Sequence, residues 1–398
     1  MSDPGSEAGV NGWRYPTLTG GRDLRIDFLR GVAMFMVVVA HIEIPSAYHF
    51  FTKERFGVVT SAEAFVLLSG LIIGLIYPGR IVLDGWTKAA LKLFRRGAQL
   101  YVVSLGVAIG VYLLRFNPLL NASALYTFTD TRTGIVYDLY DSTGGDALSF
   151  IRNMLILRYG PGQFNIMGLY VVLMVVTLFV LWALEHRMII LVALISGGIY
   201  LYNAANPTRV TIAQFENAFS LLAWQALFII GILIGYHWEN LLGIARGKLG
   251  RPLVIIITVA FFVLMFYSLN NPWIDVPRDM RLKFIEEDLF NQIYAHYFSR
   301  VWLGMGRILN TLIVFAVFYV LLTHFWKGFN RVAGWFLIPI GQASLYVFVV
   351  HLFFLMLMAN IPLFQENRIW VNAMGETAVL LAIWFMVRHR VLFKIIPR

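Results

Sequence analysis

The stretch RDLRIDFLRGVAMFMVVVAHIEIP, residues 22–45, decides the fold class of this chain. A cationic opening leads into an apolar run that is long enough to cross the hydrocarbon core of a bilayer, for which a helix needs about 20 residues. Similar runs recur along the sequence without the period-two alternation that is typical of strands. We predict ten spanning helices, at residues 27–45, 61–78, 97–115, 164–184, 187–203, 218–237, 251–269, 304–325, 338–359 and 372–391.

The composition agrees with this prediction. Of 398 residues, 59% are hydrophobic and only 14% are charged, and the mean hydropathy is +0.72. Soluble domains carry about 25% charge, so a soluble fold and a disordered chain are both excluded. The chain has no cysteine, which rules out disulfides, zinc–thiolate sites and a cysteine nucleophile. We therefore predict an all-α, polytopic integral membrane protein with membrane lipid around it.

The distribution of charge predicts the orientation. With the N-terminus in the cytosol, the cytosolic segments hold 19 of the 32 Lys and Arg residues and seven of the 22 Asp and Glu residues. Because cytoplasmic loops carry an excess of cations, we expect both termini inside, and the net charge of +10 does not indicate nucleic acid. Residues 1–24 are expected to form a flexible cytosolic tail, and 25–398 a single transmembrane domain.

Two long polar loops, 116–163 and 270–303, lie outside in this topology. Long loops in a compact protein are often functional. The loops either grip a ligand on the extracytoplasmic face or form a solvated cap, and both alternatives stay open. Their carboxylates are Asp130, Asp138, Asp141, Asp146, Asp275, Asp279, Glu286, Glu287 and Asp288.

The first span carries two ionisable residues on one face. Arg30 and His41 are eleven residues apart, which is three helical turns plus about 20° and a rise of about 16 Å. Arg30 can grip a phosphate at the cytosolic mouth, and His41 can accept a proton near mid-membrane. The alternatives are an ion pair of Arg30 with Asp27 and a histidine that is simply satisfied in the core.

Further polar residues suggest a site around this face. Arg25, Lys92, Arg95 and Arg96 either anchor lipid headgroups or complete a polyphosphate site with Arg30. Glu63 either orients His41 or faces water at the interface, and Ser69 packs helices or takes part in the chemistry. Side chains of the eighth and ninth predicted spans either line a substrate cavity or bond helices together: Arg307, Gln342, Tyr346 and His351. The sequence has no nucleotide-binding loop and no metal-ligand spacing.

Four motifs in order resemble those of the OpgC-type membrane acyltransferases, which are related to the acyltransferase-3 group. They are RIDFLRG (25–31), SAEAFVLLSG (61–70), LAWQALFIIG (222–231) and GQASLYVFVVHL (341–352). The Arg, ten residues, His signature of the wider group matches Arg30 and His41. This resemblance implies transfer of an acyl group from cytosolic acyl-CoA to a hydroxyl of an extracytoplasmic glycan in a bacterial cytoplasmic membrane.

The resemblance also implies roles for individual residues. His41 would be the catalytic base, Arg30 the arginine of the shared motif, and Glu63 and Ser69 part of the second-span motif. The OpgC type is named for succinylation of periplasmic glucans, so succinyl-CoA is the expected donor and Arg307 a candidate cation for the succinyl carboxylate. Ser69, Gln342 or Tyr346 could stabilise the oxyanion, and direct attack is expected because no cysteine exists.

Two departures from the family pattern put the acceptor and the acyl chain in question. The sequence NIMGLY (165–170) stands where D-I-L-P-L-Y is expected, and Ser220 and Leu221 stand where N-P is expected. The competing function is a transporter or flippase for a glycan or lipid-linked precursor. The repeated halves that many transporters have are not visible in this sequence. A binding or scaffold protein is the third alternative.

Overall fold

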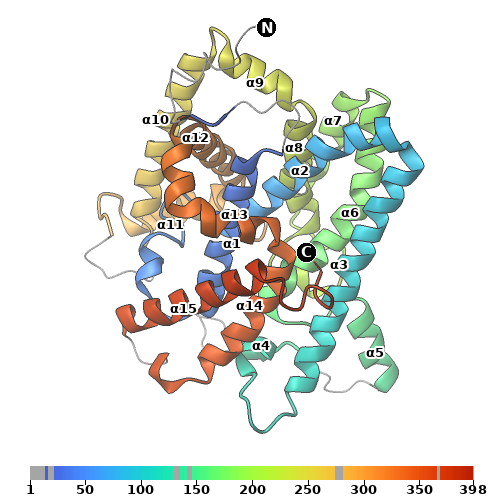
Figure 1. Cartoon of the computed structure of the whole chain (residues 1–398), viewed down its shortest axis with the longest axis vertical. Helices are drawn as coiled ribbons and strands as arrows, with labels where there is room; N and C mark the ends of the chain where they lie inside the picture. The colour runs from blue at the N-terminus through green and yellow to red at the C-terminus, as the bar shows by residue number, and fades with distance from the viewer. Residues whose placement is uncertain are drawn as a thin grey trace, which may run out of the picture.

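The computed structural model describes residues 14–16, 22–129, 135–140, 146–273, 281–364 and 368–397. Most of the predicted N-terminal tail lies outside these ranges, as do Asp130, Asp141, Asp275 and Asp279. The described part is mostly helical (Figure 1), as expected for an all-α protein.

A helix covers most of each of the ten predicted spans. The corresponding elements are α1 (Leu24–Ile42), α2 (Ser61–Asp84), α3 (Trp86–Leu114), α6 (Asn165–Glu185), α7 (Ile189–Ala205), α8 (Leu221–Tyr236), α10 (Gly250–Leu269), α12 (Met305–Phe329), α13 (Trp335–Gln342) with α14 (Ser344–Ala359), and α15 (Ile369–Arg388).

Shorter elements connect these helices. They are α4 (Ser123–Tyr126), α5 (Ala147–Leu155), α9 (Trp238–Arg246) and α11 (Glu287–Tyr297), the 3-10 turns η1 (Ala47–Phe50), η2 (Gly162–Phe164), η3 (Gln214–Asn217) and η6 (Pro362–Phe364), and the π-helical turn η5 (Asn330–Gly334).

Six described helices are long and apolar enough to cross a membrane by length and composition, or seven if α8 and α9, bent by 70°, form one span. The six are Ser61–Asp84, Trp86–Leu114, Gly162–Glu185, Gly250–Leu269, Met305–Gln342 and Ile369–Arg388. Helices α7 and α14 are shorter, and α1 carries Arg25, Asp27 and Arg30 near its start. The protein is therefore a polytopic membrane protein, and the count of ten and the orientation stay predictions.

Two expectations need correction. The segment 338–359 is not one helix, because α13 ends at Gln342 and α14 begins at Ser344, with Ala343 outside helical geometry between them. Pro339, inside α13, lacks a backbone N–H, and the Trp335 carbonyl that it leaves without a helical donor accepts from Nε1 of Trp384 at 3.0 Å. At the break itself, Ser344 and Gln342 contact Arg30 and Asp27 of α1.

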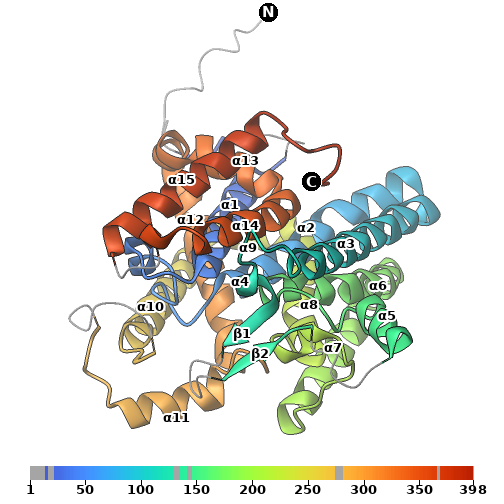
Figure 2. The same ribbon diagram turned by 90° about the horizontal axis from the view of Figure 1, so that it is seen from below.

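The second correction concerns strands, of which none was expected. Strands β1 (Thr127–Thr129) and β2 (Val136–Asp138) pair antiparallel, with Thr127 opposite Asp138. Three residues are too few for an alternating pattern to be recognised. The hairpin lies in the first long polar loop, residues 116–163, beside α4 (Figure 2).

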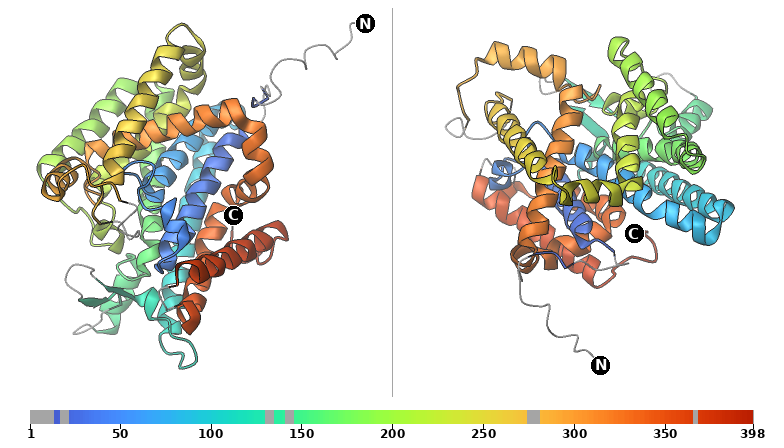
Figure 3. Two further views of the ribbon diagram at one scale, coloured as in Figure 1. Left: turned by 90° about the vertical axis from the view of Figure 1, so that its left-hand side faces the viewer. Right: turned by 90° about the horizontal axis from the view of Figure 1, so that it is seen from above.

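Glycines let two helix pairs approach closely. A Cβ atom at Gly70 or Gly74 of α2 would collide with carbonyl oxygens of α8, and one at Gly31 of α1 would collide with a carbonyl oxygen of α13. Small residues at helix interfaces permit this backbone contact. Helix α1 thereby lies inside the molecule, with α10 and α11 on one side and α3 and α6 on the other (Figures 1 and 3).

Candidate functional site

His41 meets His351 inside the helix bundle. Nδ1 of His41 and Nε2 of His351 are 2.8 Å apart, and the two rings stack with their centroids 5.0 Å apart. His351 is buried, and His41 is half-buried near the C-terminal end of α1. The structure thus joins two sequence-predicted site residues that are 310 positions apart.

Aromatic rings connect this histidine pair to the N-terminal part of α6. The ring of Phe348 packs edge-on against both histidines, at 6.1 Å from His41 and 5.2 Å from His351. Phe65 stacks on Phe348 and packs edge-on against Tyr170. One aromatic wall therefore extends from the histidine pair to the N-terminal parts of α2 and α6.

Arg30 lies where α13 breaks from α14. Its Nη2 donates to the hydroxyl of Ser344, while its Nε is buried without a hydrogen-bond partner among the described residues. The hydroxyl of Tyr170 lies near Ser69 and Arg30 and is itself buried without a hydrogen-bond partner among the described residues. Ser69 is half-buried beside them on α2. A buried guanidinium with an unused donor can bind an anion.

Asp27 is held by residues other than Arg30. Its Oδ1 accepts a charge-assisted hydrogen bond from Arg22 at 2.6 Å, and its Oδ2 accepts one from Gln342 at 3.0 Å. Gln342 thus joins the break between α13 and α14 to α1. Arg22 and Arg96 lie within electrostatic reach of Arg30, so three cations gather near the start of α1.

The other predicted cations differ in their surroundings. Arg25 is enclosed, since it donates to Asp23 and Thr323 and its guanidinium lies between the rings of Tyr15 and Tyr319. Tyr15, in the predicted flexible tail, is thereby packed against α12. On α3, Lys92 pairs with Asp84 at 2.5 Å and is exposed like Arg95, whereas Arg96 is half-buried.

Glu63 and Arg307 form a second buried cluster. Nη1 of Arg307 donates to Glu63 at 2.6 Å, Nη2 contacts Glu54 and the Tyr294 hydroxyl, and Nε donates to the Phe298 carbonyl at 2.6 Å. Both Glu63 and Arg307 are fully buried. Every guanidinium nitrogen therefore has a protein acceptor, and Glu63 pairs with Arg307 rather than with His41.

The remaining contacts of this cluster close its hydrogen-bond network. The second oxygen of Glu63 accepts from the backbone N–H of Thr60 at 2.9 Å, as part of the capping box that begins α2. Burial raises the pKa of Tyr294 to about 12, so its phenol stays protonated and donates to Glu54 at 3.2 Å. Glu54 lies in the loop before α2 and Tyr294 on the short helix α11. Neither stands in a predicted span, so the sequence offered no spacing that would have identified them.

Tyr346 is the last of the predicted site residues. Tyr346 is buried against Phe393, and its hydroxyl has no partner among the described residues. Sequence reasoning did not assign a role to Ser344 or Tyr170, although both lie in the quoted motifs. Within the described ranges, no three His, Asp or Glu residues come together as a metal-binding group.

Spanning helices around a buried helix with ionisable residues define a polytopic membrane protein with a polar site in its interior. A model of the OpgC protein family matches residues 22–395, nearly the whole sequence, and the chain therefore belongs to this family. No curated protein and no solved structure matches it.

Proposed function

We propose that this protein transfers an acyl group, with succinyl as the best candidate, from cytosolic acyl-CoA to a hydroxyl of an extracytoplasmic cell-envelope glycan. The OpgC family is associated with acyl transfer, which supports the reaction class. Within this chain, one observation carries the proposal. His41, on the same helix as Arg30, contacts His351 of α14.

The proposed topology has ten spans in a bacterial cytoplasmic membrane, with both termini inside. In this orientation Arg30 faces the cytosolic side and His41 lies about 16 Å further outward along α1. Acyl-CoA enters from the cytosol and the glycan from outside, so the two substrates meet at the histidine pair. The aromatic wall of Phe348, Phe65 and Tyr170 supports an apolar course for the acyl-bearing arm.

The phosphates of acyl-CoA require cations, and three lie within electrostatic reach around Arg30. Arg30, Arg96 and Arg22 form the inner part of the proposed phosphate site, and Lys92 and Arg95 are exposed on α3. Arg25 is left out of this site because Asp23 and two tyrosine rings already enclose it. Its role is to hold the start of α1 against α12.

His41 acts as the general base in the proposed reaction. Nδ1 of His351 is buried without a hydrogen-bond partner among the described residues, and the proposal places the proton of the neutral ring there. A proton on that nitrogen leaves Nε2 of His351 to accept the N–H of His41 Nδ1, so Nε2 of His41 carries a free lone pair. His351 is therefore a positioning residue that sets the tautomer of His41.

The chemistry follows from that tautomer. Nε2 of His41 takes the proton of the glycan hydroxyl while the hydroxyl oxygen attacks the thioester carbonyl carbon. The carbon–sulfur bond then breaks, the new ester stays on the glycan, and the leaving thiolate receives the proton from His41. Ser69 and Tyr346 have the hydroxyl donors that could stabilise the oxyanion, whereas Gln342 is committed to Asp27.

Arg307 has a different role in this proposal from the one expected for it. Its nitrogens all contact protein acceptors, so a succinyl carboxylate would have to displace Glu54 or Glu63. We assign Arg307 and Glu63 to holding the outer ends of α2 and α12 together. Arg300, exposed and within electrostatic reach of His41, is the better candidate for the carboxylate.

The test is a transfer assay with the purified full chain in nanodiscs. Succinyl-CoA and a periplasmic glucan fraction should together release free CoA and yield succinylated glucan by mass spectrometry. His41→Ala should abolish both signals at wild-type stability, whereas His324→Ala, an exposed histidine of α12, should leave them unchanged. Near-normal transfer by His41→Ala would refute the catalytic assignment, and a wild-type protein without transfer would favour the transporter.

A further inference from the structure

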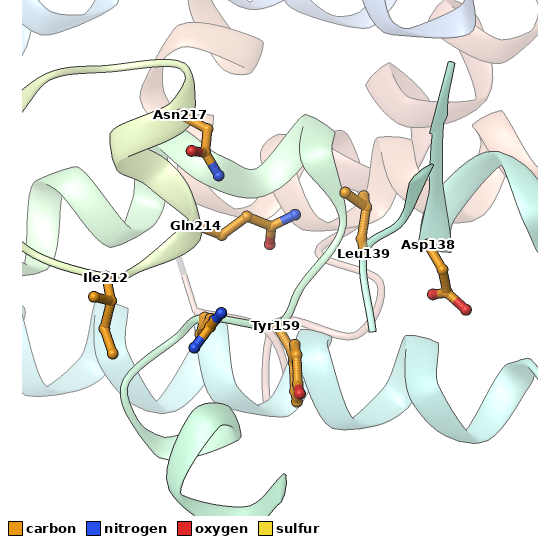
Figure 4. Close-up of a pocket in the computed structure, with 7 residues that line it drawn as sticks. Asp138, Leu139, Tyr159, Ile212, Gln214 and Asn217 are labelled. Carbon is orange, nitrogen blue, oxygen red and sulfur yellow. The ribbon is translucent and has the colours of Figure 1, made fainter. Parts of the chain in front are cut away.

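A cavity opens on the side of the molecule that holds the first outer loop, away from the cations around Arg30. Its volume is about 370 Å³, which is at the small end of the range for small-molecule sites. Strand β2, the segment between α5 and η2, and the segment at η3 supply its walls (Figure 4). The lining residues are Asp138, Leu139, Arg158, Tyr159, Ile212, Gln214 and Asn217.

Gln214 is a buried amide that points into this cavity. The side chain is 7% exposed, and its Nε2 has no hydrogen-bond partner among the described residues. The backbone N–H of Gln214 donates to the Leu157 carbonyl at 3.0 Å, which fixes the residue in place. In Figure 4 the amide lies between Asn217 and Tyr159, directed toward Leu139. A buried donor left unpaired costs about 1–3 kcal/mol, so the site is built for an acceptor.

The other polar groups suit a neutral ligand with many hydroxyls. Asp138 supplies carboxylate acceptors and is itself anchored by Arg115 at 2.7 Å. Arg158 and Asn217 are exposed and supply donors, and Tyr159 supplies an aromatic edge. Because Arg115 already neutralises Asp138, Arg158 is the one cation among the lining residues, which is too little charge to favour a phosphate or a polyanion. Hydroxyl groups both donate and accept, and they can use every one of these partners.

The cavity leads toward the histidine pair. A smaller adjoining cavity of about 30 Å³ shares Tyr159 and Gln214 with it and is also lined by Phe164. The ring of Phe164 lies 5.3 Å from that of Phe348, which packs against His41 and His351. Two aromatic rings therefore separate the cavity system from the proposed base. A substrate hydroxyl reaches His41 only when these rings move aside.

We propose that this cavity is the acceptor subsite, which binds a short neutral stretch of glucan through its hydroxyls. The inference rests on the proposed function, because it assigns the glycan of that reaction to a place. It adds a binding site built by the first outer loop and by η3, and it gives Gln214 the central hydrogen bond. It also assigns Phe164 and Phe348 as the rings between bound acceptor and base.

Binding without turnover tests the site directly. The full chain in nanodiscs, without acyl-CoA, is titrated with a β-linked glucose trisaccharide and followed by calorimetry or saturation-transfer NMR. Gln214→Met keeps the shape of the side chain but loses the amide, and it should weaken binding about tenfold, as expected for one lost buried hydrogen bond. The matched control is Gln292→Met on α11, an exposed amide outside the cavity, which should bind as the wild type does.

A second variant protects the test against misfolding. Asn217 is exposed, so Asn217→Ala should leave the unfolding temperature unchanged and still weaken binding of the trisaccharide. Unchanged binding in both variants, or no trisaccharide binding by the wild type at millimolar concentration, overturns the subsite. Binding that depends on Gln214 in a protein without acyl transfer supports the subsite and overturns the proposed function, so the two failures are distinguishable.

Discussion

His351 contacts His41 without facing the proposed substrate, so its effect on catalysis should pass through the orientation of His41. We expect His351→Ala to lower kcat by about 10- to 100-fold, as loss of an orienting partner typically does, while KM for acyl-CoA stays unchanged. His351→Gln, which can still accept from His41, should recover part of the rate. The assay is CoA release under saturating glucan. A rise in KM with an unchanged kcat would contradict the positioning role.

Arg30 offers a test of the phosphate site that is independent of His41. A charge-assisted hydrogen bond is worth about 1.5–3 kcal/mol, so Arg30→Ala should raise KM for acyl-CoA by about tenfold or more. Arg30→Lys keeps the charge and should raise KM for acyl-CoA by a smaller factor. With an acyl-pantetheine donor, which lacks the nucleotide phosphates, wild type and Arg30→Ala should perform alike. An equal loss with both donors would place Arg30 in packing or in the chemical step instead.

At the scale of elements, the Arg307 cluster ties the N-terminal ends of α2 and α12 to the segment that contains Glu54 and to α11. Removing one partner leaves buried charge uncompensated, so Arg307→Met should cost about 3–5 kcal/mol of stability. Thermal unfolding in detergent measures this loss, with Arg300→Met as the exposed control. A variant that unfolds like the wild type and loses only the use of succinyl-CoA would restore the carboxylate-binding role of Arg307.

The close contact of α2 with α8 is tested by adding one methyl group. An alanine at Gly70 would push its Cβ against the Phe228 carbonyl, whereas one at Gly106 of α3 meets nothing within 4 Å. Gly70→Ala should therefore lower the free energy of unfolding by about 1–3 kcal/mol or more, the usual range for overpacking. Gly106→Ala should leave it unchanged or raise it slightly, because alanine favours helix. Equal behaviour of the two variants would argue against the contact.

Local patterns in the sequence predicted which segments are helical and which face of α1 carries Arg30 and His41. These depend on period and spacing within one helix, which a single sequence records. The pairing of His41 with His351 and of Glu63 with Arg307 depends on how distant helices pack, over 310 and 244 positions. The break at Ala343 was missed because Gln342 and Ser344 stand within a long apolar run that is typical of one span, and the hairpin because three residues hold too little pattern.

The whole molecule presents surfaces that only a membrane can cover. Along α10, the side chains of Ile255, Ile256, Val259, Phe262 and Val263 are each more than half exposed. An apolar face of this extent would favour aggregation in water, and it is satisfied by lipid chains. This belt supports membrane lipid as a partner, but it is the same for either orientation of the protein. Charge is what distinguishes the two orientations.

The absence of cysteine makes the orientation directly measurable. Each engineered cysteine is then the only thiol in the chain. Cytosolic cation excess predicts that Lys88→Cys and Lys248→Cys face the cytosol, while Ala147→Cys and Gln292→Cys face outside. All four positions are exposed in the structure. On intact spheroplasts, a membrane-impermeant maleimide should label the second pair only, and permeabilisation should add the first pair. The reverse pattern would place Arg30 outside, where no cytosolic acyl-CoA could reach it, and would overturn both the topology and the proposed direction of transfer.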